Sequence, residues 1–257
     1  MNKTAVITGA TSGIGAAFAR RLASEGYDLL VTGRRKALIE KQAAELSDKY
    51  GVKVTVIIAE LSLEKDLRGL EKRLSALERV DFLVNNAGYG VYENFADTGA
   101  DEHERMVRVH VTAPVRLTRA VLPGMISRKS GAVINLSSVG SFIPMEKNGM
   151  YGGTKAFLNI FSESLNIELR DTGVRVQALC PGFTRTDFHE KLGLTTEGQK
   201  RLEGYRWMSA DEVVDCSLRC LGNNRVICVP GFSWRSILVF VKLLPRKLLY
   251  RIVREKR

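Results

Sequence analysis

Seven short apolar runs alternate with longer amphipathic segments along the chain, and this alternation restricts the fold more than any other feature. Short apolar runs bounded by turn residues are typical of buried strands. They lie at residues 5–7, 29–31, 54–58, 82–84, 132–136, 174–179 and 226–229. The segments between them have helical length, and lie at residues 14–24, 37–50, 64–77, 101–126, 151–169 and 209–221. Such alternation predicts an α/β fold, with a parallel sheet covered by helices on both faces.

A glycine-rich loop joins the first predicted strand to the first predicted helix, and reads Thr8-Gly9-Ala10-Thr11-Ser12-Gly13-Ile14-Gly15. Glycines let the backbone turn tightly and approach a pyrophosphate, while the helix N-terminus presents free N–H groups to that anion. The position between strand and helix makes this interpretation stronger than that of an ordinary glycine turn. We therefore predict a dinucleotide site that includes Gly9, Thr11, Ser12, Gly13, Ile14 and Gly15.

Further motifs follow in order along the chain. Asn85-Asn86-Ala87-Gly88 ends the fourth predicted strand, Ser138 ends the fifth, and Tyr151-Gly152-Gly153-Thr154-Lys155 begins the next helix. Together with the G-x-x-x-G-x-G spacing of the first loop, they resemble the classical short-chain dehydrogenase/reductase family over residues 3–232. The resemblance implies an oxidoreductase with a Rossmann-type, doubly wound parallel seven-stranded sheet and helices on both faces, consistent with the seven apolar runs.

The end of the second predicted strand carries the signal for the choice of cofactor. An acidic residue about 20 positions past the glycines binds the ribose 2′-hydroxyl of NAD, whereas arginine accommodates the 2′-phosphate of NADP. Here the strand is followed by Arg34, Arg35 and Lys36, with no acid among them. Arginine can hold a phosphate through two parallel hydrogen bonds. We predict NADP(H) as cofactor, with Arg34 and Arg35 as the phosphate clamp.

The resemblance implies further cofactor contacts after the third, fourth and sixth strands. The family has an adenine-binding Asp where Glu60 stands, so the extra methylene leaves open whether this contact is kept. The Asn-Ala-Gly motif packs beside the adenosine, and the turn after the sixth strand lies against the nicotinamide. The residues implied are Glu60, Leu61, Asn86, Ala87, Gly88, Pro181, Gly182, Thr184 and Thr186.

A tyrosine and a lysine four residues apart share one face of the predicted helix after the fifth strand. Hydride addition to a carbonyl leaves negative charge on oxygen, and a nearby acid must supply a proton. A neighbouring ammonium favours the phenolate and lowers the tyrosine pKa from about 10. The resemblance implies that Tyr151 exchanges the proton, that Lys155 also binds the nicotinamide ribose, and that Ser138, rather than Ser137, orients the carbonyl.

The chain departs from the family pattern at His110, where the family has an asparagine that distorts the helix. The distortion frees a backbone carbonyl to hold a water, which links the lysine to solvent. Histidine donates and accepts hydrogen bonds and titrates near pH 6.5. We count His110 among the predicted catalytic residues, in the proton relay; the alternative is that it only fills the space.

Residues 187–207 resemble the family's substrate-covering lid. Their apolar side chains predict an apolar carbonyl or secondary alcohol as substrate, and the residues concerned are Phe188, Leu192, Leu194, Tyr205 and Trp207.

The formal net charge of +11 is concentrated at the C-terminal end, because residues 235–257 contain eight basic residues and one acid. The longest apolar run there, 237–244, is shorter than the about 20 residues that a bilayer-crossing helix needs. We divide the chain into one Rossmann-type domain, 1–233, and a basic amphipathic extension, 234–257.

Three interpretations of this extension stay open. It docks on its own domain or on a second subunit, it lies in the interface of an anionic membrane, or it lines the substrate entrance. An apolar stripe at helical spacing is set apart from most of the basic residues, and consists of Leu248, Leu249, Ile252 and Val253.

The four cysteines lack a zinc-ligand spacing, and the N-terminus lacks the pattern of an export signal. We predict no metal site, four reduced cysteines of which Cys216 and Cys220 are buried on a helix, and a cytoplasmic location, with peripheral membrane association if the extension binds lipid. The basic residues belong to no nucleic-acid-binding module, so we expect no nucleic acid as partner.

The leading hypothesis is an NADPH-dependent carbonyl reductase, or the reverse alcohol dehydrogenase, that works on a small molecule as a homodimer or homotetramer. The alternative is an NADP(H)-binding sensor or regulator that has lost turnover. The Ser138, Tyr151 and Lys155 set argues against this alternative, whereas His110 and Glu60 leave it open.

Overall fold

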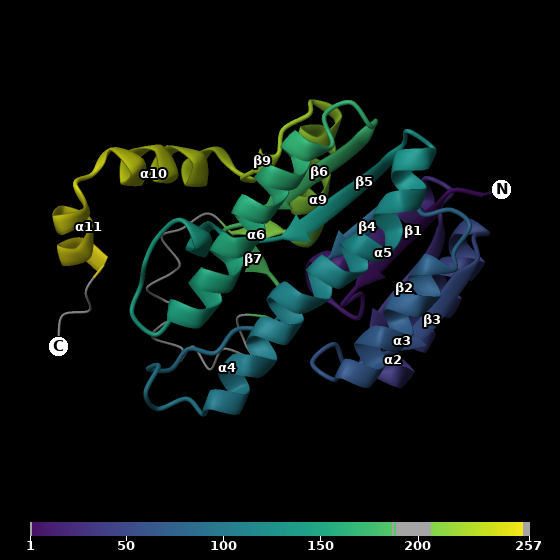
Figure 1. The fold of residues 1–257 in the computed structure, drawn as a ribbon, viewed down its shortest axis with the longest axis horizontal. Helices are drawn as coiled ribbons and strands as arrows, with labels where there is room; N and C mark the ends of the chain where they lie inside the picture. The colour runs from purple at the N-terminus through teal and green to yellow at the C-terminus, as the bar shows by residue number, and fades with distance from the viewer. Residues whose placement is uncertain (1, 187, 189–206, 254–257) are drawn as a thin grey trace.

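The computed structural model describes residues 2–186, 188 and 207–253, which form a layered α/β fold (Figure 1). Seven strands form a parallel sheet in the order β3-β2-β1-β4-β5-β6-β9. Their bounds are β1 Thr4–Thr8, β2 Asp28–Gly33, β3 Val54–Ile58, β4 Phe82–Asn85, β5 Gly131–Leu136, β6 Val174–Leu179 and β9 Ile227–Cys228. The chain order reverses between β1 and β4, which confirms the predicted doubly wound Rossmann-type sheet.

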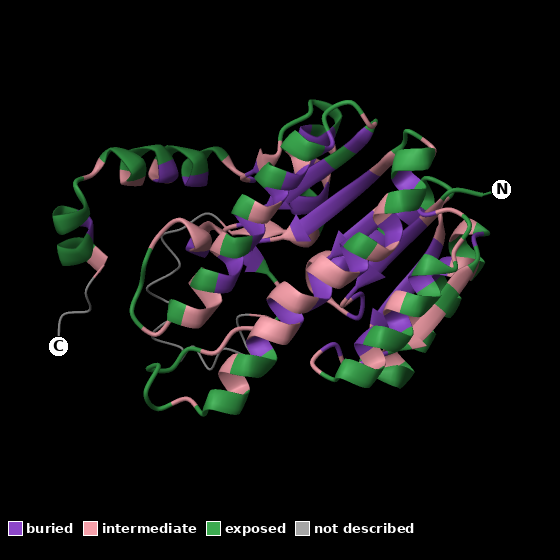
Figure 2. Cartoon of the chain, in the orientation of Figure 1, coloured by how far each residue is buried: buried purple, intermediate pink, exposed green. Residues whose placement is uncertain are grey.

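Helices cover both faces of the sheet. On one face α1, α2 and α9 pack over side chains such as Ala5 and Ile7, and on the other α3, α5 and α6 pack over Val6. Figure 2 shows the strands as a buried layer between these helices. The helix bounds are α1 Gly13–Ser24, α2 Lys36–Tyr50, α3 Glu64–Ser75, α4 Ala100–Val107, α5 Ala113–Ser127, α6 Gly149–Glu168 and α9 Ala210–Gly222.

Local sequence signals fix several of these ends. Gly51 ends α2 in the left-handed conformation, with φ of 66°, which costs glycine little. The capping box predicted before α9 is present, since the Ser209 hydroxyl accepts from the Glu212 N–H at 3.2 Å and the Glu212 carboxylate accepts from the Ser209 N–H at 2.7 Å.

One predicted helix, residues 101–126, is wrong as a single regular element. The structure divides it into α4, a π-helical turn η1 at Arg108–Thr112, and α5. A π-turn widens the helix by one residue and is frequent at functional sites. His110 lies within this turn.

Three short elements near the ends of β5 and β6 were not predicted. A 3₁₀ turn η2 covers Val139–Ser141, and β7 (Thr184–Arg185) pairs with β8 (Met208–Ser209) in a second, two-stranded sheet. This small sheet ties the turn after β6 to the start of α9.

The predicted C-terminal extension folds as two helices, α10 (Phe232–Leu243) and α11 (Arg246–Val253), which reach away from the sheet in Figure 1. The residues of its predicted apolar stripe differ in burial, because Leu249 is buried whereas Leu248 and Ile252 are exposed. No helix in the described part of the chain is both long and apolar enough to cross a membrane.

All four cysteines are free and buried, which includes Cys216 and Cys220, the two for which burial was predicted. Three of them, Cys216 and Cys220 on α9 and Cys228 on β9, place their sulfurs within 4.8 Å of one another. The Cys228 thiol donates to the Cys216 carbonyl at 3.7 Å. All three belong to the core on one face of the sheet, where small thiols fill the space between helix and strand.

Candidate active site

The motifs from the sequence converge at the carboxyl ends of β1, β4, β5 and β6. The glycine loop follows β1, Asn86–Gly88 follows β4, Ser138 follows β5 and Pro181–Thr186 follows β6. The carboxyl edge of an open parallel sheet, where the strand order reverses, is where such folds bind ligands.

The glycine loop is closely packed. Gly9 and Gly13 have φ of 66° and 56°, in the left-handed region. A Cβ on Gly15 would lie 2.4 Å from the Gly9 carbonyl oxygen and 2.4 Å from Nδ2 of Asn86. That Asn86 amide donates to the carbonyls of Thr8 and Gly9, each at 2.9 Å. The loop therefore needs glycine both for its backbone conformation and for its close contact with the turn after β4.

The N-terminus of α1 has the features of an anion-binding site. Its N-cap Ser12 makes no side-chain cap hydrogen bond, and its first turn contains no acidic residue. The positive end of the helix dipole is therefore not neutralised by the helix's own side chains. Arg35 reaches across from the end of β2 and donates to the hydroxyls of Thr11 at 2.8 Å and Ser12 at 3.0 Å. This donor set fits the phosphates of a dinucleotide.

Arg34 and Arg35, predicted as one clamp, have different partners. Arg34 donates to Oε2 of Glu60 at 2.7 Å, and Oε1 of Glu60 accepts from the Ser62 N–H at 3.1 Å. Burial of Glu60 by itself would raise its pKa, but the hydrogen bonds from Arg34 and Ser62 outweigh it and hold the pKa below its usual range. Glu60 thus stays ionised and pairs with Arg34, while its adenine contact stays a prediction. Leu61 beside it is buried.

The turn after β4 is held by buried polar groups. The Thr8 hydroxyl accepts from the N–H groups of Asn86 and Ala87, each at 3.0 Å. Asn85 donates to Asn135 on β5 at 2.9 Å. These bonds link β1, β4 and β5 at the edge that carries the site. Gly88 faces η1 and α6, because a Cβ there would lie 3.0 Å from Nε2 of His110 and 3.5 Å from Nζ of Lys155.

The predicted catalytic residues lie together. Nζ of Lys155 is 5.6 Å from the ring centre of Tyr151, as four-residue spacing on α6 requires. Lys155 is 3% exposed and donates to the Leu136 carbonyl at 2.6 Å. The Ser138 hydroxyl, which accepts from the Gly140 N–H at 3.1 Å, also hydrogen-bonds the Tyr151 phenol.

Desolvation controls the protonation of this pair. It raises the pKa of Tyr151 to about 12, with the Ser138 hydrogen bond acting in the opposite direction, and it lowers the pKa of Lys155 to about 8. The expected lowering of the tyrosine pKa by the lysine is therefore not met in the protein alone. With a pKa of about 8, Lys155 is still mostly protonated near neutrality, so its positive charge is present beside Tyr151.

The two serines after β5 have different surroundings. Ser137 is 2% exposed, and its hydroxyl donates to the backbone carbonyl of Lys155 at 2.9 Å, so it holds β5 to α6. Ser138 instead lies beside the phenol of Tyr151. These positions agree with the preference for Ser138 as the residue that orients a carbonyl.

His110 is 1% exposed and connects two segments of the site. Its Nε2 accepts from the Tyr89 N–H at 3.1 Å, so the proton of the neutral ring is on Nδ1, which lies 3.0 Å from the Thr154 hydroxyl. Thr154 in turn donates to the Tyr151 carbonyl at 2.9 Å. Burial, and next the charge of Lys155, hold the pKa of His110 well below its usual value. A part for His110 in proton transfer stays a prediction.

The turn after β6 packs against the glycine loop, and its contact with the nicotinamide stays a prediction. A Cβ on Gly13 would lie 3.0 Å from Cγ2 of Thr186. The Thr184 hydroxyl donates to the Gly182 carbonyl at 3.0 Å, and the Pro181 carbonyl accepts from the Val139 N–H at 3.0 Å. The turn is therefore joined to the loop that carries Ser138.

Aromatic side chains stand beside the catalytic group. The Phe188 ring is 6.0 Å from the Tyr151 ring, and Trp207 stacks on Phe183 with ring centres 5.2 Å apart. Of the lid residues named from the sequence, Leu192, Leu194 and Tyr205 lie outside the described residues.

Two residues that contact the site, Trp234 and Thr154, were not predicted from the sequence. The Trp234 indole packs against Gly182 so closely that a Cβ there would lie 2.0 Å from Nε1, and its ring is 5.4 Å from that of Phe183. Gly182 and Trp234 lie far apart in the sequence, so their contact could be recognised only once the fold was known.

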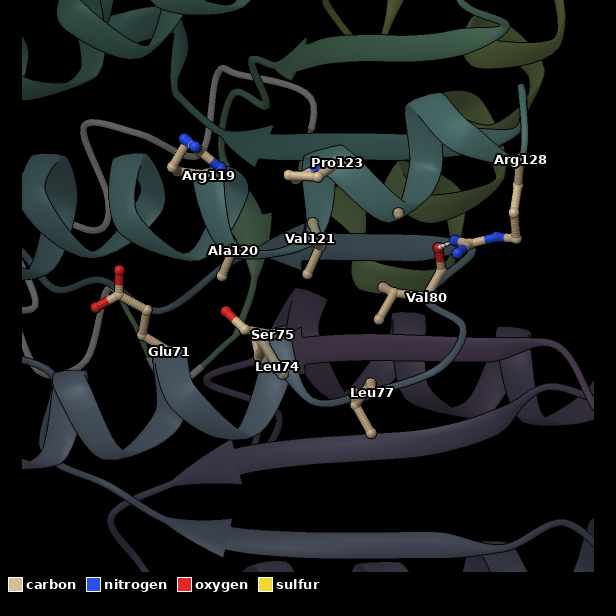
Figure 3. Close-up of a pocket in the computed structure, with 11 residues that line it drawn as sticks. Glu71, Leu74, Ser75, Leu77, Val80, Arg119, Ala120, Val121, Pro123 and Arg128 are labelled. Atoms are coloured by element: carbon tan, nitrogen blue, oxygen red, sulfur yellow. Dashed lines mark hydrogen bonds between the residues drawn. The ribbon is translucent and has the colours of Figure 1, made fainter.

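A groove of about 490 Å³ lies elsewhere, between α3 and α5. Figure 3 shows Glu71 and Leu74 on one side of it and Arg119 and Val121 on the other. It shares no residue with the catalytic set, so we assign it no part in the chemistry.

Comparisons with known proteins agree with this geometry. The family model described as short chain dehydrogenase matches residues 3–197. A serine 3-dehydrogenase from Agrobacterium fabrum is 38% identical over 218 residues, which cover 84% of this chain and 86% of that protein.

Solved structures resemble the chain over nearly its whole length. A short-chain dehydrogenase from Sphingobium yanoikuyae in complex with NADPH has a TM-score of 0.84 and 33% identity, and covers 100% of this chain and 98% of that one. The bulky-bulky ketone specific alcohol dehydrogenase from Comamonas testosteroni has a TM-score of 0.79 and 32% identity, and covers 99% and 96%.

Proposed function

Because the chain belongs to the short-chain dehydrogenase family and is thus an oxidoreductase, we propose that it is an NADP(H)-dependent carbonyl reductase, or the reverse alcohol dehydrogenase. The observation that carries this proposal is the convergence of Ser138, Tyr151 and Lys155 next to a glycine loop whose hydroxyls bind Arg35. The NADPH complex of the Sphingobium relative supports the choice of cofactor.

The residues that would hold the cofactor follow from the fit described above. The α1 N-terminus would bind the pyrophosphate and Arg35 the 2′-phosphate, with Thr11 and Ser12 beside them. Thr184 and Thr186 would fix the carboxamide. When bound, the nicotinamide supplies or accepts the hydride.

Side chains of the protein carry out the proton transfer. Ser138 holds the substrate oxygen by a hydrogen bond, and Tyr151 donates its phenol proton to that oxygen as negative charge develops there. With a pKa of about 12, the phenol is fully protonated at neutral pH, which suits the reductive direction. The ammonium of Lys155 stabilises the phenolate left behind, and Ser137 and Thr154 hold the backbone that positions this pair.

We propose an apolar carbonyl compound or secondary alcohol as substrate. Phe188 beside Tyr151, and Trp207 on Phe183, give the site an apolar margin. The Comamonas relative is described as a bulky-bulky ketone specific alcohol dehydrogenase, which supports a ketone or secondary alcohol as substrate. Assembly into a homodimer or homotetramer stays a prediction.

The test is NADPH oxidation by the purified protein with a panel of apolar ketones and aldehydes. We expect turnover that Tyr151→Phe reduces by at least about a hundredfold, in line with the usual contribution of general acid catalysis, while NADPH still binds. Turnover that persists in Tyr151→Phe would contradict the mechanism. NADPH binding without turnover of any carbonyl would favour the alternative of a nucleotide sensor.

A further inference from the structure

The outward surface of the C-terminal arm, which we define as α10 and α11, is unusually apolar. Four large apolar side chains of α10 are well exposed: Phe232 at 82%, Leu243 at 78%, Phe240 at 63% and Val239 at 60%. On α11, three more are exposed, namely Leu248, Tyr250 and Ile252. Contiguous apolar surface of this kind marks a protein or membrane contact.

The same surface carries only positive charge. Residues 232–253 contain no aspartate or glutamate, and their basic side chains are all exposed: Arg235, Lys242, Arg246, Lys247 and Arg251. The alternation of cations with exposed apolar groups distinguishes the arm from helices such as α1 and α3, where Arg21 pairs with Glu25 and Arg68 with Glu64.

The inward side of the arm is attached to the catalytic end of the domain. Trp234 is buried against Gly182 and Phe183 in the turn predicted to meet the nicotinamide. Nζ of Lys242 lies 6.0 Å from the ring centre of Phe142, directly after the turn that begins at Ser138. Figure 2 shows the exposed side of the arm facing away from the sheet. Whatever binds the arm therefore approaches the end of the molecule that holds the active site.

We propose that the C-terminal arm binds the surface of an anionic membrane. Exposed aromatic and aliphatic groups interleaved with lysine and arginine, on helices too short to cross a bilayer, are the composition of an interfacial amphipathic segment. The apolar groups enter the headgroup region, while the cations are attracted to acidic lipids.

Charge favours this partner over a second copy of the chain. A symmetric contact between two arms would bring Arg246, Lys247 and Arg251, with no acid among residues 232–253, against an identical set of cations, and like charges in contact disfavour association. An acidic lipid surface instead complements the arm. Given the proposed function, the binding would place the substrate side of the enzyme at the membrane, where apolar carbonyl compounds accumulate.

The test is sedimentation of the full-length protein with phospholipid vesicles. We expect binding to vesicles with 30 mol% phosphatidylglycerol, little binding to pure phosphatidylcholine, and a severalfold loss of binding in 0.5 M NaCl, because salt screens exposed charges. Absence of binding to the acidic vesicles would overturn the proposal.

Two variants locate the contact. Arg246→Gln with Lys247→Gln removes charge, and Phe240→Ser with Leu243→Ser removes apolar surface; each should reduce vesicle binding at least fivefold.

The matched controls are Lys41→Gln with Lys49→Gln on α2, and Ile167→Ser on α6, which is exposed to 64% against 63% for Phe240. The controls should bind as the unaltered protein does. Equal losses in controls and arm variants would refute the arm as the contact.

Further measurements distinguish membrane binding from misfolding and from a contact between subunits. NADPH binding and circular dichroism verify that each variant is folded. If the arm variants alter the molecular mass seen by light scattering but not vesicle binding, the arm is an interface between subunits and the proposal is wrong. Vesicle binding without carbonyl reduction would instead leave the proposal intact and contradict the proposed function.

Discussion

Lys155 is the residue at which function and stability conflict most directly. It is buried, its pKa is lowered to about 8 by desolvation, and its ammonium donates to a backbone carbonyl rather than to a carboxylate. The unfolded pKa is about 10.4, so the unfolded chain binds more protons than the folded one between pH 8 and pH 10.4, and stability rises with pH across that window. The free-energy cost of burying the charged ammonium of Lys155 is therefore largest below pH 8.

Lys155→Met should therefore stabilise the cofactor-free protein at pH 7 while abolishing turnover. A shift of this size corresponds to at most about 3 kcal/mol, and the difference from the unaltered protein should vanish above about pH 10. Thermal unfolding of both proteins at pH 7 and pH 10 measures it. A methionine variant less stable than the unaltered protein at pH 7 would show that the ammonium is well compensated in the fold.

Arg35 and Arg34 should differ in their effect on cofactor choice, although their sequence context is the same. Arg35 binds the hydroxyls of the glycine loop, whereas Arg34 is paired with Glu60. Loss of charge-assisted hydrogen bonds to a phosphate costs roughly 1.5–3 kcal/mol, so Arg35→Ser should raise the KM for NADPH by about 10- to 100-fold and leave that for NADH nearly unchanged. Arg34→Ser should have a smaller effect. Steady-state kinetics with both cofactors decides, and an equal loss for NADH in Arg35→Ser would exclude a 2′-phosphate contact.

Substitution of His110 tests whether its imidazole takes part in the proton relay from Lys155 to solvent. Its ring is neutral, and Nε2 and the Lys155 ammonium both face Gly88. If His110 belongs to the proton path, His110→Asn should lower kcat by about tenfold, less than the roughly 100- to 10,000-fold contribution of a direct acid–base catalyst, and change the pH profile of kcat. His110→Phe should reduce kcat further, because it keeps no hydrogen-bonding group. An unchanged pH profile in His110→Asn would leave His110 only its link between Tyr89 and Thr154.

At this scale the sequence predicts residue types better than their partners. Ser138, Tyr151 and Lys155 could be named because their spacing follows from one strand end and one helix face. The pairing of Arg34 with Glu60, and of His110 with Thr154, joins residues 26 and 44 positions apart. Such contacts depend on how the elements pack, and local pattern contains no information about that.

At the level of elements, the strands were predictable because buried parallel strands are continuous apolar runs. The apolar pattern did not predict the π-turn at Arg108–Thr112; only the resemblance, in which an asparagine at the position of His110 distorts the helix, indicated an irregularity there. The β7–β8 pair was not predicted either, because two-residue strands carry no periodicity. The π-turn lies beside the catalytic tyrosine, since the His110 ring is 5.8 Å from that of Tyr151.

The contact between the turn after β6 and α10 can be tested by a double substitution. Gly182→Ala should destabilise the protein by about 1–3 kcal/mol, the usual cost of overpacking, because the new methyl would overlap the Trp234 indole. Trp234→Leu should largely rescue Gly182→Ala, which a double-mutant cycle of unfolding free energies measures. Additive losses in the double variant would show that the two residues do not contact each other.

For the molecule as a whole, the site draws on the ends of four strands and on both flanking layers, so cofactor binding should stabilise the entire domain. A ligand present at 100 times its Kd adds about 2.7 kcal/mol to the free energy of unfolding, and about 1 kcal/mol raises the Tm of a chain of this size by roughly 2–4 °C. NADPH at that excess should therefore raise the Tm by roughly 5–10 °C. NADH at the same concentration should raise it much less, because Arg35 then has no 2′-phosphate to bind. Differential scanning fluorimetry compares the two cofactors, with Arg35→Ser as the variant in which the difference should disappear. Equal shifts with NADH and NADPH in the unaltered protein would overturn the proposed preference for NADP(H) and leave the fold and the catalytic residues untouched.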